Sequence, residues 1–275
     1  MIVEFISLQS LDGATAKVCT QGAHLLSWTT SNGEEQLFLS QSSAFKPKVA
    51  IRGGVPIIFP QFSDRGSLPR HGFARTGIWK VVSTQQTPSG QSQAVFSFSS
   101  NKDTRKIWPY DFYLTMTITV GGNKLTLALT VKNTGKETFS FTNALHTYFR
   151  LNKLAASRLR GLKGHVYNDF VSLQKHCIEQ SEELIINGEI DRVYADVSTT
   201  IEMSDGKRTL SIKQSNFSDA VVWNPGPEKA AALADLEVNG YKKMLCIEAG
   251  NILRSITLES GATWSGSQDI QATYA

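Results

Sequence analysis

The stretch LTMTITVGGNKLTLALTV, residues 114–131, decides the fold class. Apolar and polar residues alternate through LTMTITV and again through LTLALTV, and the turn Gly121-Gly122-Asn123 joins the two halves. Alternation with a period of two places successive side chains on opposite faces of a strand. The stretch therefore predicts a β-hairpin with one face in the core and the other facing water or a ligand.

The same alternation recurs along the chain, whereas helical signals are scarce. One short helix is predicted at 228–236, an alanine-rich segment preceded by Pro225 and Pro227. Turn sequences such as Ser31-Asn32-Gly33 separate the apolar runs. The runs themselves predict further strands at 2–6, 25–28, 95–98, 139–149, 209–213, 220–223, 244–248 and 256–258.

The organisation of the chain favours an all-β protein, a large antiparallel β-sandwich with few short helices. A length of 275 residues allows one large domain or two small ones. No repeat, linker or compositional break divides the sequence. We therefore expect residues 1–275 to form a single domain, and a division into two domains is the alternative.

Composition limits the classes of function. Hydrophobic residues make up 41% and charged residues 19%, which is typical of a globular protein. No stretch holds about 20 apolar residues, so no membrane span is expected. The net charge of +4 is too small, and its basic residues too scattered, for a nucleic-acid partner. It suits a small anionic ligand better.

Other features of the sequence bear on location and metals. Glu4 and the lack of a basic segment before it argue against a signal peptide, which predicts a cytoplasmic protein. The cysteines Cys19, Cys177 and Cys246 form no CxxC pair, and the five histidines show no HxH or HxxxH spacing. Neither a disulfide framework nor a metal site is predicted.

Two arginine-bearing segments are candidates for anion binding. In IRGGVPIIFPQF, residues 51–62, Arg52 precedes two glycines whose bare backbone allows close approach of another group. In LPRHGFAR, residues 68–75, Arg70, His71 and Arg75 lie within six residues. Guanidinium groups bind phosphate or carboxylate through a planar fork of donors. The alternative is a pair of solvated basic loops.

A histidine and a glutamate are candidates for acid–base chemistry. In FSFTNALHTYF, residues 139–149, alternation places His146 and Tyr148 on the polar face of a strand. In MLCIEAGN, residues 244–251, Glu248 ends an apolar run, where burial would raise its pKa and suit it to a general base. The alternatives are a structural histidine and a glutamate that reaches water at a strand end.

One further carboxylate is a candidate ligand for hydroxyl groups. Asp191 stands beside Arg192 in NGEIDRVY, residues 187–194, which we interpret as a loop. The alternative is a surface ion pair between these two neighbours.

Seven motifs together resemble those of the hexose-6-phosphate mutarotases. These enzymes, also called glucose-6-phosphate 1-epimerases, are a branch of the aldose 1-epimerase (galactose mutarotase-like) superfamily. The motifs span most of the chain, from about residue 50 to 252, in the same order: IRGGVPIIFPQF, LPRHGFAR, WPYDF at 108–112, TNALHTYF, IDRVY, VVWNP at 221–225 and MLCIEAGNI.

The resemblance implies a β-sandwich of the galactose mutarotase type with a sugar cleft on its concave face. It implies interconversion of the α and β anomers of a hexose 6-phosphate, most simply glucose 6-phosphate. By motif, His146 matches the family's general acid and Glu248 its general base. Arg52 and Arg75 match arginines that hold the phosphate and sugar, Asp191 matches a sugar-hydroxyl ligand, and His71 is expected to line the cleft.

Two positions depart from the family pattern. Arg70 replaces a residue that is often glutamine, which would strengthen anion binding or point outward. Gly226 replaces a bulky aromatic residue, which predicts a more open wall of the cleft and leaves the preferred hexose undecided.

The chemistry expected from these residues is ring opening and reclosure. An acid and a base on opposite sides of the sugar suffice, with no metal, redox cofactor or covalent intermediate. The expected partner is a small-molecule sugar phosphate, and a monomer is the default. The alternatives are an aldose 1-epimerase of free sugars and a non-catalytic carbohydrate-binding β-sandwich. A glycoside hydrolase is disfavoured because it typically uses two carboxylates.

Overall fold

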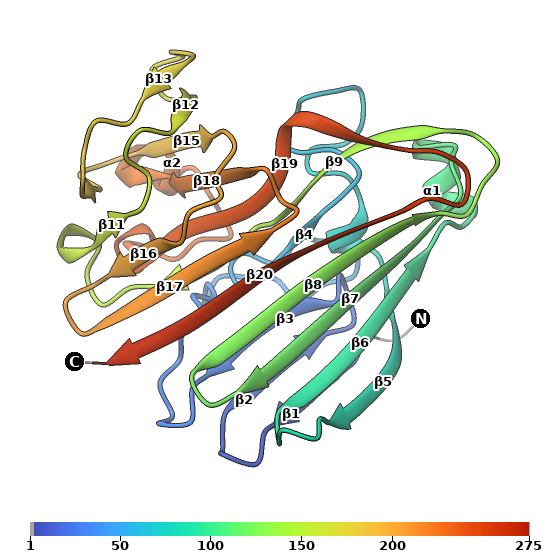
Figure 1. Ribbon diagram of the computed structural model, residues 1–275, viewed down its shortest axis with the longest axis horizontal. Coiled ribbons are helices and arrows are strands. Elements are labelled where there is room, and N and C mark those ends of the chain that lie inside the picture. The colour runs from blue at the N-terminus through green and yellow to red at the C-terminus, as the bar shows by residue number, and fades with distance from the viewer. Residues whose placement is uncertain (1–2, 275) are drawn as a thin grey trace.

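Three antiparallel sheets make up the computed structural model, which describes residues 3–274 (Figure 1). The largest sheet has nine strands. In sheet order they are β14 (Leu184–Ile185), β11 (Arg158–Arg160), β16 (Ile201–Ser204), β17 (Arg208–Ser215), β20 (Thr263–Tyr274), β8 (Lys124–Asn133), β7 (Phe112–Gly121), β6 (Ser92–Ser99) and β5 (Lys80–Gln86).

The second sheet has eight strands and the third has three. The eight-stranded sheet runs in the order β13 (Cys177–Ile178), β12 (Val166–Asp169), β15 (Ile190–Tyr194), β18 (Asp219–Asn224), β19 (Met244–Leu258), β9 (Phe139–Leu145) and β4 (Ile57–Ile58), and β10 (Tyr148–Arg150) also pairs with β19. The three-stranded sheet contains β1 (Phe5–Gln9), β2 (Thr15–Cys19) and β3 (His24–Thr29).

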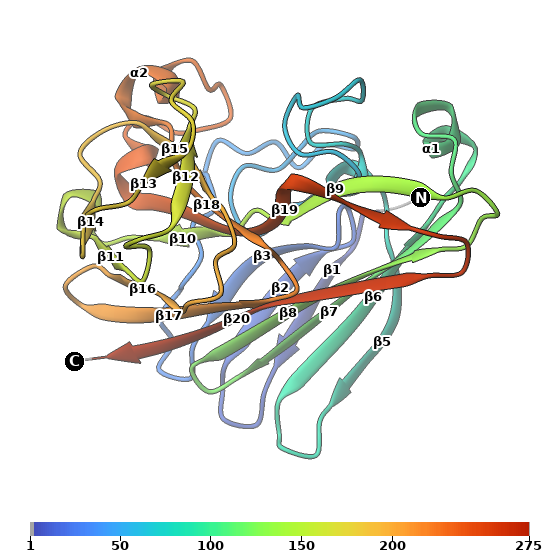
Figure 2. The ribbon, with the colours of Figure 1, turned by 45° about the horizontal axis from the view of Figure 1, so that its top comes forward.

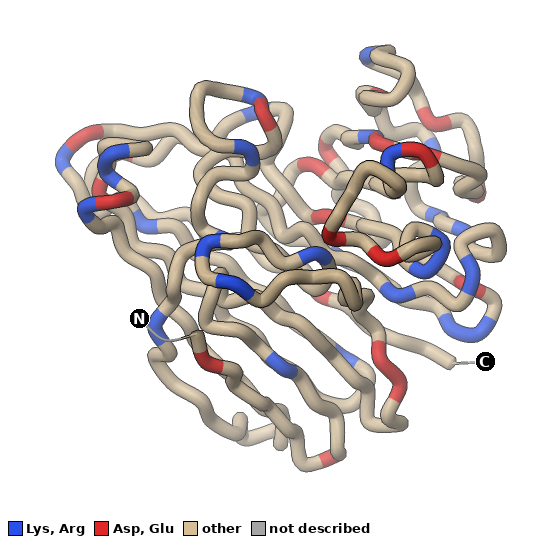
Figure 3. Tube along the Cα trace, turned by 180° about the vertical axis from the view of Figure 1, so that it is seen from behind, with Lys and Arg blue, Asp and Glu red and all other residues tan. Residues whose placement is uncertain are grey.

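Within residues 3–274 the α-helices are α1 (Lys102–Ile107) and α2 (Gly226–Ala231), each of six residues. Neither has the length or the apolar character needed to cross a membrane. The all-β prediction is confirmed. Figure 3, which views the molecule from behind, shows acidic and basic residues interspersed along the trace.

The β7–β8 hairpin confirms the prediction from residues 114–131. Leu114 pairs with Val131, Met116 with Leu129, Ile118 with Leu127 and Val120 with Leu125, and all eight side chains are buried. The intervening threonines are half-buried on the other face. Alternation along this hairpin thus sets which face enters the core.

One continuous core joins the three sheets. It contains apolar residues of the nine-stranded sheet such as Leu127, of the eight-stranded sheet such as Ile247, and of the small sheet such as Leu25. Figure 2 shows the two large sheets as separate layers. Because strand side chains alternate, packing one face of the eight-stranded sheet on this core leaves its other face free to line a cavity.

Several predicted elements differ in extent. The strand expected at 139–149 is split into β9 and β10, because the Thr147 amide donates to the Leu145 carbonyl at 3.0 Å in a local turn. The strands expected at 244–248 and 256–258 form the single long strand β19. The strand expected at 2–6 begins at Phe5, and Ile2 lies outside the described residues.

Two predictions of local structure were wrong in ways that matter for the site. The IDRVY segment is strand β15 and not a loop, because it pairs with β12 and β18 on its two sides. The helix expected at 228–236 ends at Ala231. Beyond it Leu236 packs into a small apolar cluster with Tyr148, and Asp235 bonds to Arg52. These tertiary contacts override the helical propensity of the alanines.

Candidate active site

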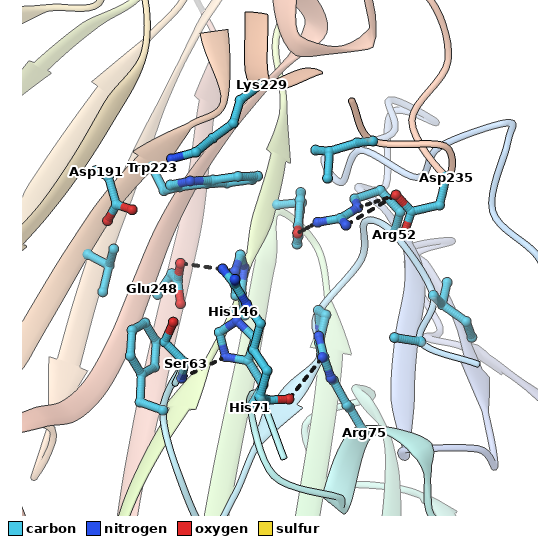
Figure 4. A pocket seen from close by; sticks show the side chains of 18 of the residues that line it. Arg52, Ser63, His71, Arg75, His146, Asp191, Trp223, Lys229, Asp235 and Glu248 are labelled. Carbon is cyan, nitrogen blue, oxygen red and sulfur yellow. Dashed lines mark hydrogen bonds and ion pairs between the residues drawn. The ribbon is translucent and has the colours of Figure 1, made fainter. Parts of the chain in front are cut away.

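A cavity of about 510 Å³ lies on the free face of the eight-stranded sheet. Strands β15, β18, β19 and β10 supply its floor, and the loops around β4 and after α2 supply its walls. The seven residues singled out from the sequence all line it, and Figure 4 labels six of them: Arg52, His71, Arg75, His146, Asp191 and Glu248, with Arg70 the seventh.

His146, in the link between β9 and β10, is a direct neighbour of Glu248 on β19. Leu145 pairs with Ala249 and Tyr148 pairs with Cys246, so the register between them sets His146 opposite Glu248. His146 Nε2 lies 3.2 Å from Glu248 Oε1. We expected an acid and a base on opposite sides of the sugar, but this contact leaves no room for a ring between them. The pair can approach a sugar only from one side.

Burial governs the protonation of this pair. Glu248 is 1% exposed and its pKa is raised well above the usual value by desolvation, with a smaller contribution from the charge of Asp191. His146 is 8% exposed, and desolvation lowers its pKa, with contributions from His71, Arg52 and Arg75. Both shifts favour a neutral imidazole beside a protonated carboxyl when the cavity holds no ligand.

His71 packs against this pair. Its ring lies edge-on to that of His146 with centroids 5.7 Å apart, and its Nδ1 accepts a hydrogen bond from the Ser63 amide at 3.2 Å. Burial, with help from nearby arginines, lowers the pKa of His71 to about 3. The ring is therefore neutral at physiological pH and carries its proton on Nε2, because Nδ1 is the acceptor.

Arg52 is held in place by its own loop and by two side chains. Its Nε and Nη2 donate to Asp235 Oδ1, both at 3.1 Å, and its Nη1 donates to the Tyr148 hydroxyl at 3.1 Å. The next residues are Gly53 and Gly54, both with positive φ. A Cβ on Gly54 would lie 2.2 Å from the Leu25 carbonyl oxygen, so only glycine permits this approach.

Arg75 enters the same end of the cavity with less support. It is half-buried, and its Nη2 donates to the Arg70 carbonyl at 3.2 Å. Within residues 3–274 it forms no ion pair with a carboxylate, and desolvation together with the charges of Arg52 and Arg70 lowers its pKa. Arg70 itself is mostly exposed, with Nε 3.5 Å from Asp64 Oδ1. The guanidinium of Arg75 thus lies in a site that favours an anion.

Asp191 lies at the other end of the cavity (Figure 4). Alternation along β15 sends Asp191 to the cavity face and Arg192 to the opposite face. Arg192 there bonds to Asp169 and Glu179, at 3.1 and 3.0 Å, so the surface pair between Asp191 and Arg192 does not form. Desolvation raises the pKa of Asp191, and the charge of Lys229 opposes that shift.

The lining also includes Tyr148, Trp223, Lys229 and Asp235, which were not selected as site residues from the sequence. Alternation had already placed Tyr148 on the polar face beside His146. Trp223 could have been found in the same way, since it lies two positions from Val221, which also lines the cavity. Lys229 and Asp235 could not, because their positions depend on how α2, which carries Lys229, and the segment after it, which carries Asp235, pack over the cavity. Asp235 places a carboxylate beside the arginines, and Lys229 adds a cation near Asp191.

Gly226 does not form the open wall that its sequence suggested. It is buried with φ of 62°, and a Cβ there would lie 2.7 Å from the Glu189 amide. It does not line the cavity, where the nearby α2 contributes Lys229. Glycine at this position is therefore required by the backbone turn.

Comparison with known proteins places the chain in a family. The model of the aldose 1-epimerase family matches residues 4–271. A protein of Cenchrus ciliaris, provisionally named a glucose-6-phosphate 1-epimerase, is 34% identical over 274 residues, covering 96% of this chain and 83% of its own. A protein of Escherichia coli with the same provisional name is 34% identical over 237 residues, covering 85% and 78%.

A solved structure agrees. The crystal structure of a protein of Salmonella typhimurium, provisionally described as a mutarotase, superposes with a TM-score of 0.91 at 29% identity, covering 99% of this chain and 91% of the other. The fold class predicted from the sequence, a galactose mutarotase-type β-sandwich, is confirmed by this likeness and by the antiparallel sheets. With a family match that spans nearly all of its residues, this chain belongs to the aldose 1-epimerase family.

Proposed function

We propose that the protein interconverts the α and β anomers of a hexose 6-phosphate, with glucose 6-phosphate as the first substrate to test. Family membership supports epimerisation at an anomeric carbon. The single observation that supports a phosphorylated substrate is the environment of Arg75. Its guanidinium is half-buried in the cavity, and its charge is disfavoured by burial and by Arg52 and Arg70. A dianion would relieve that cost with charge-assisted hydrogen bonds.

The proposed catalytic pair is His146 and Glu248. Opening a pyranose requires removal of the proton on the C1 hydroxyl and protonation of the ring oxygen. Both oxygens are bonded to the same carbon, so an acid and a base that act on them must be neighbours. The contact of 3.2 Å between His146 Nε2 and Glu248 Oε1 suits this requirement. Each transfer contributes about 10²–10⁴-fold to the rate.

The proton count of the pair balances over the reaction. With His146 protonated and Glu248 ionised, the carboxylate takes the C1 hydroxyl proton and the imidazolium gives a proton to the ring oxygen. The ring C1–O bond breaks, and the C1 carbonyl forms. Rotation about C1–C2 presents the other carbonyl face. Closure then returns both protons, which regenerates the ion pair and gives the opposite anomer.

The remaining lining residues bind and orient the sugar in this proposal. Arg52 and Arg75, with Arg70 at the rim, hold the phosphate. Asp191, at the other end of the cavity, accepts hydrogen bonds from sugar hydroxyls. His71 packs against His146 and keeps the ring from rotating. Positioning of this kind supplies the part of the acceleration that proton transfer does not.

The test is polarimetry of freshly dissolved α-glucose 6-phosphate and α-glucose with the protein and with Arg75→Ala. Each charge-assisted bond contributes about 1.5–3 kcal/mol. We expect kcat/KM for glucose 6-phosphate to fall about 10- to 100-fold in the variant. The value for glucose should change little, because glucose lacks the phosphate. Arg254→Ala, whose exposed side chain pairs with Asp196 outside the cavity, is the matched control.

The same measurement tests the alternatives. Arg52 already has Asp235 as a counter-ion, which favours an aldose 1-epimerase of free sugars as the second candidate. Equal kcat/KM values for glucose and glucose 6-phosphate in the unaltered protein would support that candidate. They would refute the proposed preference for a phosphorylated sugar. If the protein accelerates the mutarotation of neither sugar, the result would point to a non-catalytic sugar-binding protein.

We also propose that the protein works as a monomer in the cytoplasm. Charged sugar phosphates do not cross a bilayer unaided, so an enzyme that uses them belongs where they are made. The cysteines Cys19, Cys177 and Cys246 are free thiols, which suits a reducing compartment. Subcellular fractionation and light scattering in solution test the two parts of this proposal.

A further inference from the structure

Tyr148 contacts both Arg52, at the arginine end of the cavity, and His146 of the proposed catalytic pair. Its ring stacks on that of His146, with centroids 4.7 Å apart and planes inclined by 12°. Its hydroxyl accepts the hydrogen bond from Arg52 Nη1 at 3.1 Å. The side chain is 3% exposed and stands on β10, which is paired with the long strand that carries Glu248. It is therefore a rigid link between an arginine and the histidine.

We propose that Tyr148 is a positioning residue that couples the arginine end of the cavity to His146, so that an anion bound there prepares the histidine for proton transfer. The proposal rests on the proposed function, because it assigns to the substrate phosphate a second task besides binding. In general terms, binding energy from a remote part of a substrate is used to raise the rate at the reacting centre.

The contacts of His146 explain why it needs such a link. Its Nδ1 is buried and has no hydrogen-bond partner within residues 3–274. Its orientation depends on Glu248 at Nε2, on the stacked ring of Tyr148, and on edge-on contacts with His71 and Trp223. The stacked ring of Tyr148 is the nearest of the three rings, with centroids 4.7 Å apart against 5.7 Å for His71 and 5.8 Å for Trp223. A shift of the Tyr148 ring would be transmitted directly to the imidazole.

Electrostatics act in the same direction. The charged or titratable groups that face His146 are Glu248 on β19, Tyr148 on β10, His71 and Arg75 from the loop and short helix that follow β4, and Arg52 from the loop before it. Desolvation and the positive charges lower the pKa of His146. A dianion on Arg52 and Arg75 would cancel much of that charge and favour the imidazolium beside an ionised Glu248.

The experiment separates the anion from the sugar. Mutarotation of α-glucose, which lacks a phosphate, is measured with and without sulfate. Sulfate is a tetrahedral dianion and too weak a base to catalyse the reaction itself, and chloride at equal ionic strength corrects for screening. We expect sulfate to raise kcat/KM for glucose by about ten-fold. Both limbs of the pH profile should move to higher pH, because the added negative charge favours protonation of the pair.

Two substitutions at Tyr148 distinguish its hydrogen bond with Arg52 from its stacking on His146. Tyr148→Phe keeps the ring stacked on His146 but removes the hydroxyl that holds Arg52. We expect the activation by sulfate to fall below about two-fold and the movement of the pH profile to shrink. Tyr148→Leu removes the stacking as well, so the rate without sulfate should also fall. Tyr113→Phe, at a half-exposed tyrosine of β7 outside the cavity, is the matched control.

The outcomes bear separately on the two proposals. Activation of the unaltered protein that persists undiminished in Tyr148→Phe would overturn the role of Tyr148. No activation of the unaltered protein by sulfate, while glucose 6-phosphate is still turned over efficiently, would overturn the coupling and leave the proposed function intact. A preference for glucose over glucose 6-phosphate would instead refute the proposed function.

Discussion

Glu248 occupies a position where a carboxylate charge is unfavourable, and it pairs with His146, whose charged form is also disfavoured by burial. Oε2 of Glu248 and Nδ1 of His146 are both buried without partners in the described part of the chain. Such groups cost free energy in a purely structural role. Their pairing at the floor of a cavity is the arrangement expected of residues that move protons.

The first prediction concerns this pair. Glu248→Gln and His146→Asn should each lower kcat for glucose 6-phosphate by about 10²–10⁴-fold, because each removes one proton-transfer group. The double variant should be little slower than the worse single variant, since the two residues act as a unit. Steady-state polarimetry gives the rates, and circular dichroism checks the fold. Losses that multiply in the double variant would contradict a shared mechanism.

His24 shows how a buried histidine without a catalytic role behaves. It is fully buried beneath the Arg52 loop, and its Nε2 lies 2.7 Å from the Gly53 carbonyl oxygen. Desolvation lowers its pKa to about 4, against an ordinary value of about 6.5. Between these values the unfolded chain binds a proton that the folded protein does not. Stability is therefore lost as the pH falls through this window.

The second prediction follows from this loss of stability at low pH. Between about pH 7.5 and pH 4.5 the His24 contribution should remove about 2–3 kcal/mol from the free energy of unfolding. His24→Gln has no such proton to bind, so its stability should fall less over the same range. Urea titrations of both proteins at the two pH values measure the difference. An equal loss in both would show that His24 does not titrate as its burial implies.

At the level of elements, the sequence predicted those helices and strands that depend on local residue patterns. It did not predict those that depend on contacts with distant parts of the chain. The hairpin at 114–131 followed from alternation alone, and so did the polar-face position of His146, whereas Glu248 was selected because it ends an apolar run. Strand β15 was missed because its two-sided pairing with β12 and β18 is not visible in five residues. The direct contact between His146 and Glu248 was missed because it depends on register between distant strands.

For some site residues the local sequence left the choice open. The motifs around Arg52, Arg75 and Asp191 made them candidates for binding an anion or hydroxyl groups, with solvated loops or a surface ion pair as the alternatives, and the resemblance to known enzymes assigned their roles. Asp235 and Lys229 were absent from both lines of reasoning, since Lys229 lies on a helix whose docking over the cavity is a tertiary contact and Asp235 lies in the segment beyond the end of that helix. The sequence thus predicts which strand faces hold polar residues, and tertiary contacts decide which loop residues join them.

The third prediction concerns the loop that carries Arg52. Gly54→Ala should lower the free energy of unfolding by about 2–4 kcal/mol, because it adds a left-handed backbone cost and a clash with the Leu25 carbonyl. Gly33→Ala is the matched control, since Gly33 also has positive φ but has open space around it. That control should lose only about 1 kcal/mol. Equal losses in chemical denaturation would show that the close approach at Gly54 is unimportant.

At the scale of the whole molecule, the sheets share their apolar interior. The core cluster includes Leu25 of β3, Leu127 of β8 and Ile247 of β19, one from each sheet. Separating any sheet from the others would therefore expose apolar surface on both sides of the break. We propose on this ground that the chain is one domain.

The fourth prediction tests that proposal. Thermal or urea unfolding should show a single cooperative transition, with coincident midpoints from far-ultraviolet circular dichroism and from tryptophan fluorescence. Trp28 and Trp79 are buried in the core and report on its loss, while circular dichroism reports on all three sheets. Two resolved transitions would favour the alternative of two domains.

The positions of the last two strands bear on how the protein is made. Strand β19 lies between β18 and β9, and β20 lies between β17 and β8, so both are interior strands of the large sheets. A ribosome delivers them after every strand that they join. Until then β9, β18, β8 and β17 present unpaired edges, which invite aggregation. At typical rates of translation residues 244–275, which hold both strands, take about 2–6 s to appear. During synthesis the nascent chain thus passes through an interval in which chaperones would have to cover these edges, and the proposed catalytic pair is complete only after β19 arrives with Glu248.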